Sequence, residues 1–174
     1  TSDIYNSLLW LRQNTPKTRA PWNPRERPEY AVLSSWDYGH WIQYIAERPT
    51  VVNNFGYQLR GNGLEDMLRV FYSPDEETVI EVCERRGVRY LFLNDMFLLT
   101  GPLTNLIGID YEKDFFGDKH PHAEQDLYYP SAAFMALPYS RMFYMDGSAS
   151  GTGAATTRFR LIFESEHTVD MYYA

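Results

Sequence analysis

Strand signals and helix signals alternate through the first half of this chain. Short apolar runs bounded by turn residues, typical of strands, lie at residues 30–34, 50–53 and 88–93. Apolar residues recur at helical spacing in the stretches between and before them, at 4–13, 41–46, 64–71 and 74–86. Strands separated by helices are typical of a sheet with helices packed on its faces. The sequence therefore predicts an α/β fold with a mixed, largely parallel sheet flanked by helices.

The clearest local signal is the helix expected at 74–86. Ser73-Pro74-Asp75-Glu76 reads as a capping box with Ser73 as the N-cap, and Gly87 is expected to end the helix in the left-handed conformation. The single cysteine, Cys83, lies among apolar residues of this helix, which predicts a small core residue. One cysteine also excludes an intramolecular disulfide and a site with several thiolate ligands.

The second half of the chain differs in character. We expect a helix at 95–106 that is kinked or ended at 100–102, a polar loop at 108–129, a short helix at 130–137, and antiparallel strands at 141–145, 157–163 and 167–172. The 174 residues are expected to form one domain. Residues 1–137 would be its α/β core and residues 138–174 an antiparallel β segment.

Composition narrows the possible partners. The chain has 16 Lys and Arg against 23 Asp and Glu, a net charge of −7. A negative chain does not attract phosphates, so binding to nucleic acid or to an anionic membrane surface is disfavoured. Apolar runs are shorter than the ~20 residues that a membrane-spanning helix needs. The chain begins with Thr1 rather than Met, which suggests a piece of a longer protein.

The densest group of polar and aromatic residues lies at 34–42, where a strand is expected to end and a helix to begin. Ligands of open parallel sheets bind at the carboxyl ends of the strands. Here the carboxylate of Asp37 can accept a hydrogen bond and the indole of Trp36 can donate one, so the two side chains suit a small hydroxyl group. The alternative is that Asp37 caps the next helix while Trp36 and Trp41 fill the core.

Residues 36–39, Trp-Asp-Tyr-Gly, resemble the Trp-Trp-Asp-Tyr-Gly (WWDYG) signature of the oligosaccharyltransferase catalytic subunit of archaeal and bacterial type. The resemblance covers roughly the first hundred residues. It includes Leu-Trp-Leu at 9–11, Asn-Thr-Pro at 14–16, Ala-Val-Leu at 31–33, Gly-His-Trp-Ile at 39–42, Val-Val-Asn-Asn-Phe-Gly at 51–56 and Gly-Val-Arg-Tyr-Leu-Phe-Leu at 87–93. This family of glycosyltransferases moves a glycan from a polyprenyl (pyro)phosphate carrier to Asn in Asn-x-Ser/Thr, the sequon of N-glycosylation.

The resemblance implies that the signature binds the Ser/Thr hydroxyl of the acceptor sequon. Trp36 and Asp37 are then expected to contact this hydroxyl, and Tyr38 and Gly39, with the neighbouring His40, to shape the turn. Ser35 stands where the family has its first Trp. Because Ser35 lacks an indole, the hydroxyl pocket is expected to be looser, to be differently selective, or to be disused in a paralogue of the enzyme.

A second motif of the family lies on a kinked helix beside the hydroxyl pocket. Met96, Leu99 and Leu103 resemble its Met-x-x-Ile-x-x-x-Ile form, with Leu in place of Ile. Asp95 is equally compatible with the family's Asp-x-x-Lys form, although Leu98 stands where Lys is expected. The alternative interpretation is a helix-capping Asp followed by core Met and Leu side chains.

The resemblance further implies that this chain is the soluble C-terminal domain of a multi-spanning membrane protein, on its extracytoplasmic (periplasmic or cell-exterior) face. In the family, a divalent cation, Mn or Mg, and its carboxylate ligands belong to the membrane-embedded part. We therefore expect no metal site and no catalytic residue here, and an isolated domain that is inactive. The expected partners are an acceptor peptide and, through the membrane domain, a lipid-linked oligosaccharide.

Other functions remain open from the residues alone. The aromatic content of 16% suits a non-catalytic module that binds carbohydrate or protein. A soluble hydrolase with Asp37 as base would need an acid or nucleophile that the sequence does not indicate. Asp118, His120, His122, Glu124 and Asp126 include metal-ligating types, but their spacing favours a solvated loop.

Overall fold

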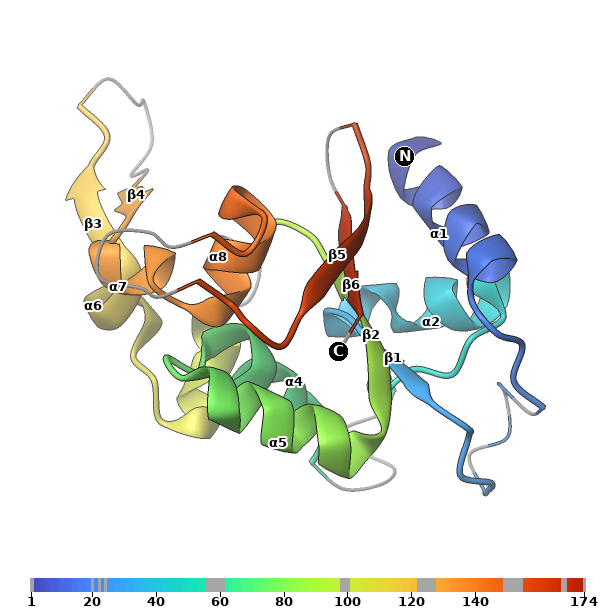
Figure 1. The fold of residues 1–174 in the computed structure, drawn as a ribbon. Coiled ribbons are helices and arrows are strands. Elements are labelled where there is room, and N and C mark those ends of the chain that lie inside the picture. The colour runs from blue at the N-terminus through green and yellow to red at the C-terminus, as the bar shows by residue number, and fades with distance from the viewer. Residues whose placement is uncertain are drawn as a thin grey trace.

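The computed structural model describes residues 2–19, 21, 23, 25–55, 62–97, 101–121, 128–148, 155–166 and 169–173 (Figure 1). The helices are α1 (Ser2–Asn14), η1 (Trp36–Tyr38), α2 (Gly39–Trp41), η2 (Ile42–Ala46), α4 (Gly63–Tyr72), α5 (Glu76–Arg86), η3 (Gly101–Ile107), α6 (Tyr111–Phe115), α7 (Ala132–Met135) and α8 (Pro138–Met145). The strands are β1 (Ala31–Leu33), β2 (Val88–Leu93), β3 (Phe116–Lys119), β4 (Tyr128–Pro130), β5 (Arg160–Glu164) and β6 (Asp170–Tyr173).

The main sheet has four strands in the order β1-β2-β6-β5. The α/β class and the mixed sheet are confirmed, but the expectation of a largely parallel sheet is wrong. β1 and β2 pair in parallel, whereas β6 is antiparallel to both β2 and β5. The C-terminal β5–β6 hairpin takes the place beside β2 that a further parallel strand would fill. Residues 50–53, expected as a strand, contribute a single bridge between Val32 and Thr50.

Helices bury both faces of the sheet. Leu91 and Leu93 of β2 belong to a hydrophobic cluster with α4 and α5, while Tyr90 and Phe92 belong to a second cluster with α1 and η2. A strand buried on both faces has no reason to alternate with polar residues, which explains the continuous apolar run at 88–93. Cys83 is buried in the first cluster, as predicted, and burial raises the pKa of its thiol to about 12.

The start of α5 differs from the expected capping box. The N-cap is Asp75, whose carboxylate accepts a hydrogen bond from the Thr78 amide at 2.8 Å, and Ser73 instead donates to Asp75. A carboxylate satisfies the free amides of a helix start and interacts favourably with the helix dipole. The same hydrogen bond holds the pKa of Asp75 below its usual range. The end at Arg86, followed by Gly87 with φ of 65°, is as predicted.

Arg48 joins the end of α1 to the segment that follows η2. Its side chain is buried, and its guanidinium donates to the carbonyl oxygens of Arg12 and Thr15 at 2.7 Å each and of Glu47 at 3.0 Å. The last carbonyls of an α-helix have no partner within the helix. Arg48 supplies the missing hydrogen-bond donors at the end of α1 and so fixes the helices that cover one face of the sheet.

The strand expected at 141–145 is wrong, because this stretch belongs to helix α8. Pro138 occupies the first turn of α8, where its missing amide proton costs nothing. Tyr139 and Met142, three residues apart, are both fully buried against the core. The two other expected C-terminal strands are present as β5 and β6, although residues 167 and 168 lie outside the described part.

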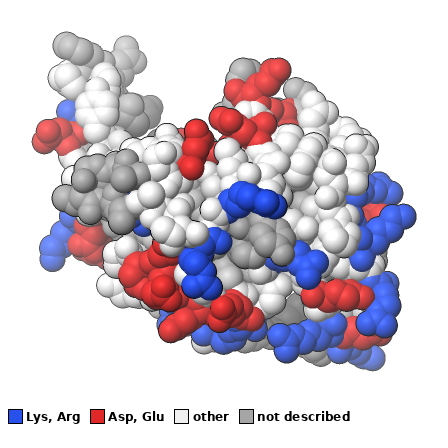
Figure 2. All heavy atoms as spheres, viewed as in Figure 1, with Lys and Arg blue, Asp and Glu red and all other residues white. Residues whose placement is uncertain are grey.

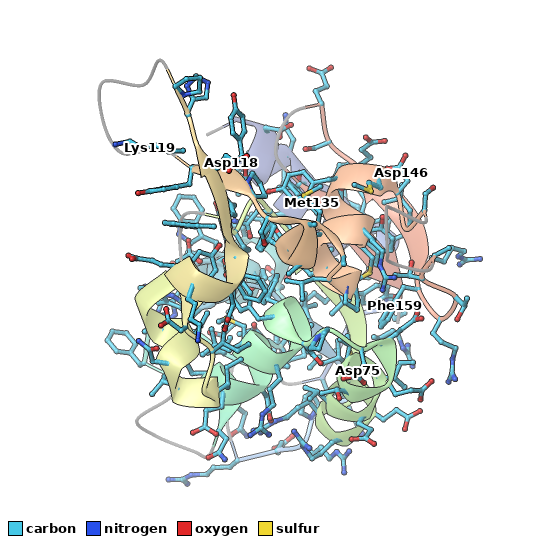
Figure 3. The ribbon with its side chains drawn as sticks, turned by 90° about the vertical axis from the view of Figure 1, so that its left-hand side faces the viewer. Asp75, Asp118, Lys119, Met135, Asp146 and Phe159 are labelled. Atoms are coloured by element: carbon cyan, nitrogen blue, oxygen red, sulfur yellow. The ribbon has the colours of Figure 1, made fainter. Side chains whose placement is uncertain are left out.

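The polar loop expected at 108–129 is also wrong for the residues described. It contains α6 and β3, and β3 pairs with β4 in a hairpin that extends from the body of the molecule (Figure 1). Asp118 and Lys119 lie on this hairpin (Figure 3). Two buried aromatic side chains, Tyr111 and Phe115, anchor α6 to the core. Long-range aromatic packing therefore gives structure to a stretch whose local composition is polar.

Candidate functional site

The candidate site lies where β1 and β2 end. Because these two strands are parallel, the segments that follow them, residues 34–39 and 94–97, leave the same edge of the sheet. The position expected for the WDYG residues, between a strand and a helix, is confirmed: Trp36, Asp37 and Tyr38 form the single 3-10 turn η1.

Gly39 allows this turn to lie against the neighbouring loop. A Cβ atom at Gly39 would lie 2.2 Å from the carbonyl oxygen of Val52 and 2.6 Å from Cα of Asn53. These distances are far below van der Waals contact, so no larger residue fits without a backbone shift. Steric contact with the neighbouring loop thus explains why the motif has glycine at this position.

Asp37 does not cap the following helix, so the capping part of the alternative is wrong. The N-cap positions of η1 and α2 are Ser35 and Tyr38, and neither side chain makes a capping hydrogen bond. The Asp37 carboxylate instead accepts a hydrogen bond at Oδ1 from the hydroxyl of Ser35. Ser35 is 1% exposed, and its Oγ also lies 3.3 Å from Oδ1 of Asn94, the residue that follows β2.

Two polar groups of the motif are left without a partner in the described part of the chain. Oδ2 of Asp37 accepts no hydrogen bond there, and the indole N–H of Trp36 donates none. Both side chains are half-buried, and Trp36 packs against the hydrophobic cluster of α4 and α5. Burial and the negative charge of Asp37 raise the pKa of the adjacent Tyr38.

Tyrosine hydroxyls hold the second segment, residues 94–97. Tyr139 donates to the carbonyl oxygen of Asn94 at 2.6 Å and accepts from the amide of Met96 at 2.8 Å. Tyr72 donates to the carbonyl of Met96 at 3.3 Å, and Tyr111 donates to the carbonyl of Phe97. This segment has no regular secondary structure, so these side chains satisfy backbone groups that would otherwise be buried without partners.

The side chain of Asp95 has its own tyrosine partner. Oδ1 of Asp95 accepts from Tyr144 at 2.7 Å and from the Phe97 amide at 3.0 Å. Burial, followed by the contact with Asp95, raises the pKa of Tyr144.

The residues expected in the second motif lie partly within the described chain. Met96 is fully buried in the hydrophobic cluster against which Trp36 and Leu103 pack, whereas Leu99 lies outside the described residues. The structure therefore brings Trp36, Met96 and Leu103 to one cluster. The kinked α-helix expected at 95–106 is wrong where it is described: 95–97 is irregular, and Gly101–Ile107 is the 3-10 helix η3.

Sequence reasoning missed Asn94 and Tyr139. A polar residue directly after the buried run at 88–93 was the available signal for Asn94. No local signal marks Tyr139, because its partners lie 43 and 45 residues away in the chain.

An acidic region borders the same edge of the sheet. Asp170 begins β6 opposite Leu93, is 6% exposed, and has a carboxylate without a hydrogen-bond partner in the described structure. Burial raises its pKa to about 7, and the charges of Glu164 and Asp146 add to the shift. Figure 2 shows acidic side chains over the tip of the β5–β6 hairpin and the end of α8, and Figure 3 labels Asp146 at that end.

Other candidate sites find no support. The described ranges contain no group of three metal-ligating side chains; Asp118 and His120 lie on or next to β3, and His122, Glu124 and Asp126 are outside those ranges. A cavity of about 400 Å³ lies at the opposite, amino ends of β1 and β2. Its lining mixes the charged residues Glu29, Glu84, Arg89 and Arg158, and none of the candidate site residues that the structure describes belongs to this lining.

The family of the chain follows from its first 97 residues. A family model described as the AglB core domain matches residues 1–97, more than half of the 174. The chain belongs to the AglB core-domain family. The matched part of this AglB core domain contains the WDYG residues, Asn94 and Met96 and ends before Leu103.

Curated relatives agree with this assignment. Dolichyl-phosphooligosaccharide-protein glycotransferase 1 of Archaeoglobus fulgidus is 37% identical over 95 residues, which cover 55% of this chain and 15% of the relative. Glycotransferase 2 of the same organism is 37% identical over 91 residues, 52% of this chain and 14% of the relative. The matched part of this AglB core domain thus covers only about 15% of the length of its curated relatives.

Solved structures match the whole fold. The C-terminal globular domain of an A. fulgidus oligosaccharyltransferase superposes with a TM-score of 0.73 at 25% identity, covering 100% of this chain and 98% of that one. Longer A. fulgidus oligosaccharyltransferase chains, 21 or 22% identical with TM-scores of 0.65 or 0.66, match over 95% of this chain and 23 to 25% of theirs. One holds an inhibitory peptide and a dolichol-phosphate, one holds Zn and sulfate, and one is tethered to an acceptor peptide with the NVT sequon. The resemblance to the C-terminal globular domain of the oligosaccharyltransferase catalytic subunit of archaeal and bacterial type is confirmed, and the comparisons identify the archaeal family, AglB.

Proposed function

We propose that this domain recognises the acceptor sequon for an oligosaccharyltransferase that transfers a glycan from a polyprenyl (pyro)phosphate carrier to Asn in Asn-x-Ser/Thr. The observation that supports it is that two consecutive residues of the motif each carry a polar group with no hydrogen-bond partner in the described part of the chain, Oδ2 of Asp37 and the indole N–H of Trp36. One acceptor and one donor on half-buried side chains are the complement of a single hydroxyl group.

The Ser/Thr side chain of the sequon would satisfy both groups. Its O–H donates to the Asp37 carboxylate, and its oxygen accepts from Trp36. An alanine at the same position would leave both groups desolvated and unpaired, which is how a polar site rejects an analogue that lacks the hydroxyl. Tyr38 and Gly39 would shape the turn, and Met96, Leu99 and Leu103 would support its apolar side.

The transfer reaction would take place in another part of the protein. By family resemblance, the divalent ion, Mn or Mg, and its carboxylate ligands would belong to the membrane-embedded part of the protein. The described residues contain no group of three metal-ligating side chains. The related structures that contain dolichol-phosphate and an NVT peptide support a lipid-linked donor and a peptide acceptor as partners. No helix in the described part of the chain is long and apolar enough to cross a bilayer. The domain would face the extracytoplasmic side from a membrane protein, and alone it would be inactive.

The test is glycan transfer by the full-length protein that carries this domain. We expect Asp37→Ala to abolish transfer to an Asn-x-Thr peptide, and Asn-x-Ala to be no substrate for either form. Asp118→Ala, which removes an exposed carboxylate on the β3–β4 hairpin, is the matched control and is expected to keep full activity. Unchanged turnover by Asp37→Ala would contradict the proposal. Transfer by the isolated domain, supplied with lipid-linked donor and metal, would contradict the expected inactivity.

Exposed aromatic side chains favour a second candidate, a carbohydrate- or protein-binding module. Trp41, Tyr44 and Phe55 are 46%, 81% and 65% exposed, and such rings stack on sugars and partner proteins. The two candidates differ in their ligands. A sugar-binding module changes its tryptophan fluorescence with free oligosaccharide, whereas the sequon pocket responds to Asn-x-Thr peptide and not to Asn-x-Ala.

A further inference from the structure

Ser35 is the position at which this chain departs from the WWDYG signature, and the structure shows what its side chain does. The residue is 1% exposed, and its hydroxyl donates to Oδ1 of Asp37. A serine hydroxyl has one proton, so a proton given to Asp37 is not available to a bound peptide. Because the hydroxyl is also buried, its lone pairs are shielded from a bound peptide, and Ser35 acts on a ligand through Asp37.

The hydrogen bond has a geometric consequence for the carboxylate. An aspartate in a short turn has several side-chain rotamers of similar energy. Holding Oδ1 on a buried hydroxyl selects one of them and leaves Oδ2, on the half-buried side chain, for a ligand. A charged acceptor makes this a strong hydrogen bond.

Asn94 extends this contact to the second segment of the site. Its side-chain Oδ1 lies 3.3 Å from Oγ of Ser35, and the residue is 4% exposed. The backbone carbonyl of Asn94 accepts from the fully buried Tyr139, which also accepts from the amide of Met96. The single proton of the Ser35 hydroxyl therefore faces two acceptors: Oδ1 of Asp37 takes the short hydrogen bond, and Oδ1 of Asn94, whose backbone carbonyl Tyr139 holds, takes the long one.

We propose that Ser35 and Asn94 are positioning residues that fix the Asp37 carboxylate for the acceptor hydroxyl, with Ser35 as the primary contact and Asn94 as its support across the ends of β1 and β2. In this chain the first position of the signature then orients the aspartate instead of forming part of the pocket wall. The proposal rests on the function proposed above and adds the residues that determine how well Asp37 meets its substrate.

The test measures transfer to an Asn-x-Thr peptide by the full-length protein with Ser35→Ala. We expect KM for the peptide to rise about tenfold while kcat stays within about twofold, because a lost hydrogen bond to a charged group weakens acceptor binding and leaves the distant reaction centre unchanged. The matched control is Ser34→Ala. Ser34 is also fully buried, but its hydroxyl donates to the Ser35 backbone carbonyl at 2.9 Å and does not reach Asp37. We expect the control to keep KM and kcat within about twofold.

Two further variants separate positioning from a general loss of structure. Asn94→Ala keeps the contact between Ser35 and Asp37 and is expected to raise KM by about threefold. The double variant is expected to raise KM no further than Ser35→Ala alone, because both residues act through the same carboxylate. Ser35→Thr retains the hydroxyl and is expected to restore most of the affinity. If Ser35→Ala does not fold, Asn94→Ala and Ser35→Thr still test the same contact.

The outcomes distinguish this inference from the function on which it rests. Full activity of Asp37→Ala would contradict both the proposed function and the positioning role. Loss of activity in Asp37→Ala together with an unchanged KM in Ser35→Ala and Asn94→Ala would overturn the positioning role alone. An equal rise of KM in Ser34→Ala and Ser35→Ala would also overturn it, since the effect would then follow the burial of the serine rather than its contact with Asp37.

Discussion

The two segments that leave the carboxyl ends of β1 and β2 are held by different means. Residues 36–46 are helical and satisfy most backbone groups locally, through η1, α2 and η2. Residues 94–97 have no helix or strand of their own and depend on hydroxyl groups of Tyr72, Tyr111 and Tyr139. One side of the candidate site is therefore built from neighbours in the sequence, and the other from residues far along the chain.

The comparison shows what the buried tyrosines contribute to the site. A tyrosine buries a large apolar ring and still carries a hydroxyl that can satisfy a backbone group. Tyr139 uses both properties, since its ring lies 5.1 Å from that of Phe71 while its hydroxyl bonds to Asn94 and Met96. The hydroxyl groups of these buried tyrosines therefore hold the backbone of residues 94–97 in place.

The largest effect is expected from Gly39→Ala, which breaks the locally built segment. The added Cβ would lie within 2.6 Å of backbone atoms of Val52 and Asn53, so the turn must move. We expect a loss of about 3 kcal/mol in the free energy of unfolding, as in overpacked cores, measured by urea denaturation. Gly108→Ala is the control: its φ is 78° with open space around it, so only the left-handed backbone penalty of about 1 kcal/mol applies. Equal losses would show that the close approach at Gly39 has no special cost.

Tyr139→Phe destabilises the second segment, residues 94–97, which is held by residues far along the chain. It keeps the ring but leaves the Met96 amide and the Asn94 carbonyl without their buried partner. We expect a loss of about 2 kcal/mol, with faster hydrogen exchange at the Met96 amide. Tyr144→Phe is the graded control, expected below about 1 kcal/mol because Tyr144 is 37% exposed and water can replace its hydroxyl at Asp95. A similar loss in both variants would contradict the role given to burial.

The smallest effect is expected from Asp170→Asn and depends on pH. The folded-state pKa of Asp170, about 7, lies above the usual value of about 4, so the folded protein holds a proton that the unfolded chain releases between these values. Stability is therefore reduced as the pH rises from 4 to 7. Asp170→Asn removes the penalty, and we expect a gain of about 1 to 2 kcal/mol at pH 8 that vanishes at pH 4, from urea denaturation at both values. Glu164→Gln, an exposed neighbour, is expected to give a smaller gain, and a pH-independent difference would contradict the assignment.

Much of the first half could be predicted because its signals are local. The helix ending at Gly87 and the strand at 88–93 lie where the sequence places them, since a glycine after a helix and an apolar run each carry their own signal. The predictions failed where contacts with residues far along the chain determine the secondary structure. The stretch 141–145 reads as a strand by composition, yet burial of Tyr139 and Met142 makes it part of helix α8.

The candidate site divides in the same way. The sequence alone pointed to Trp36 and Asp37 as the candidates for binding a hydroxyl group, and it determined that a strand precedes them and a helix follows, because the motif and its flanking patterns are continuous in the chain. The tertiary structure decided that Ser35 bonds to Asp37, that Asn94 lies beside them, and that Tyr139 holds the second segment. These contacts join residues from 2 to 59 positions apart. Hydrophobic periodicity specifies which face of an element is buried, but not which polar groups meet once the elements have packed.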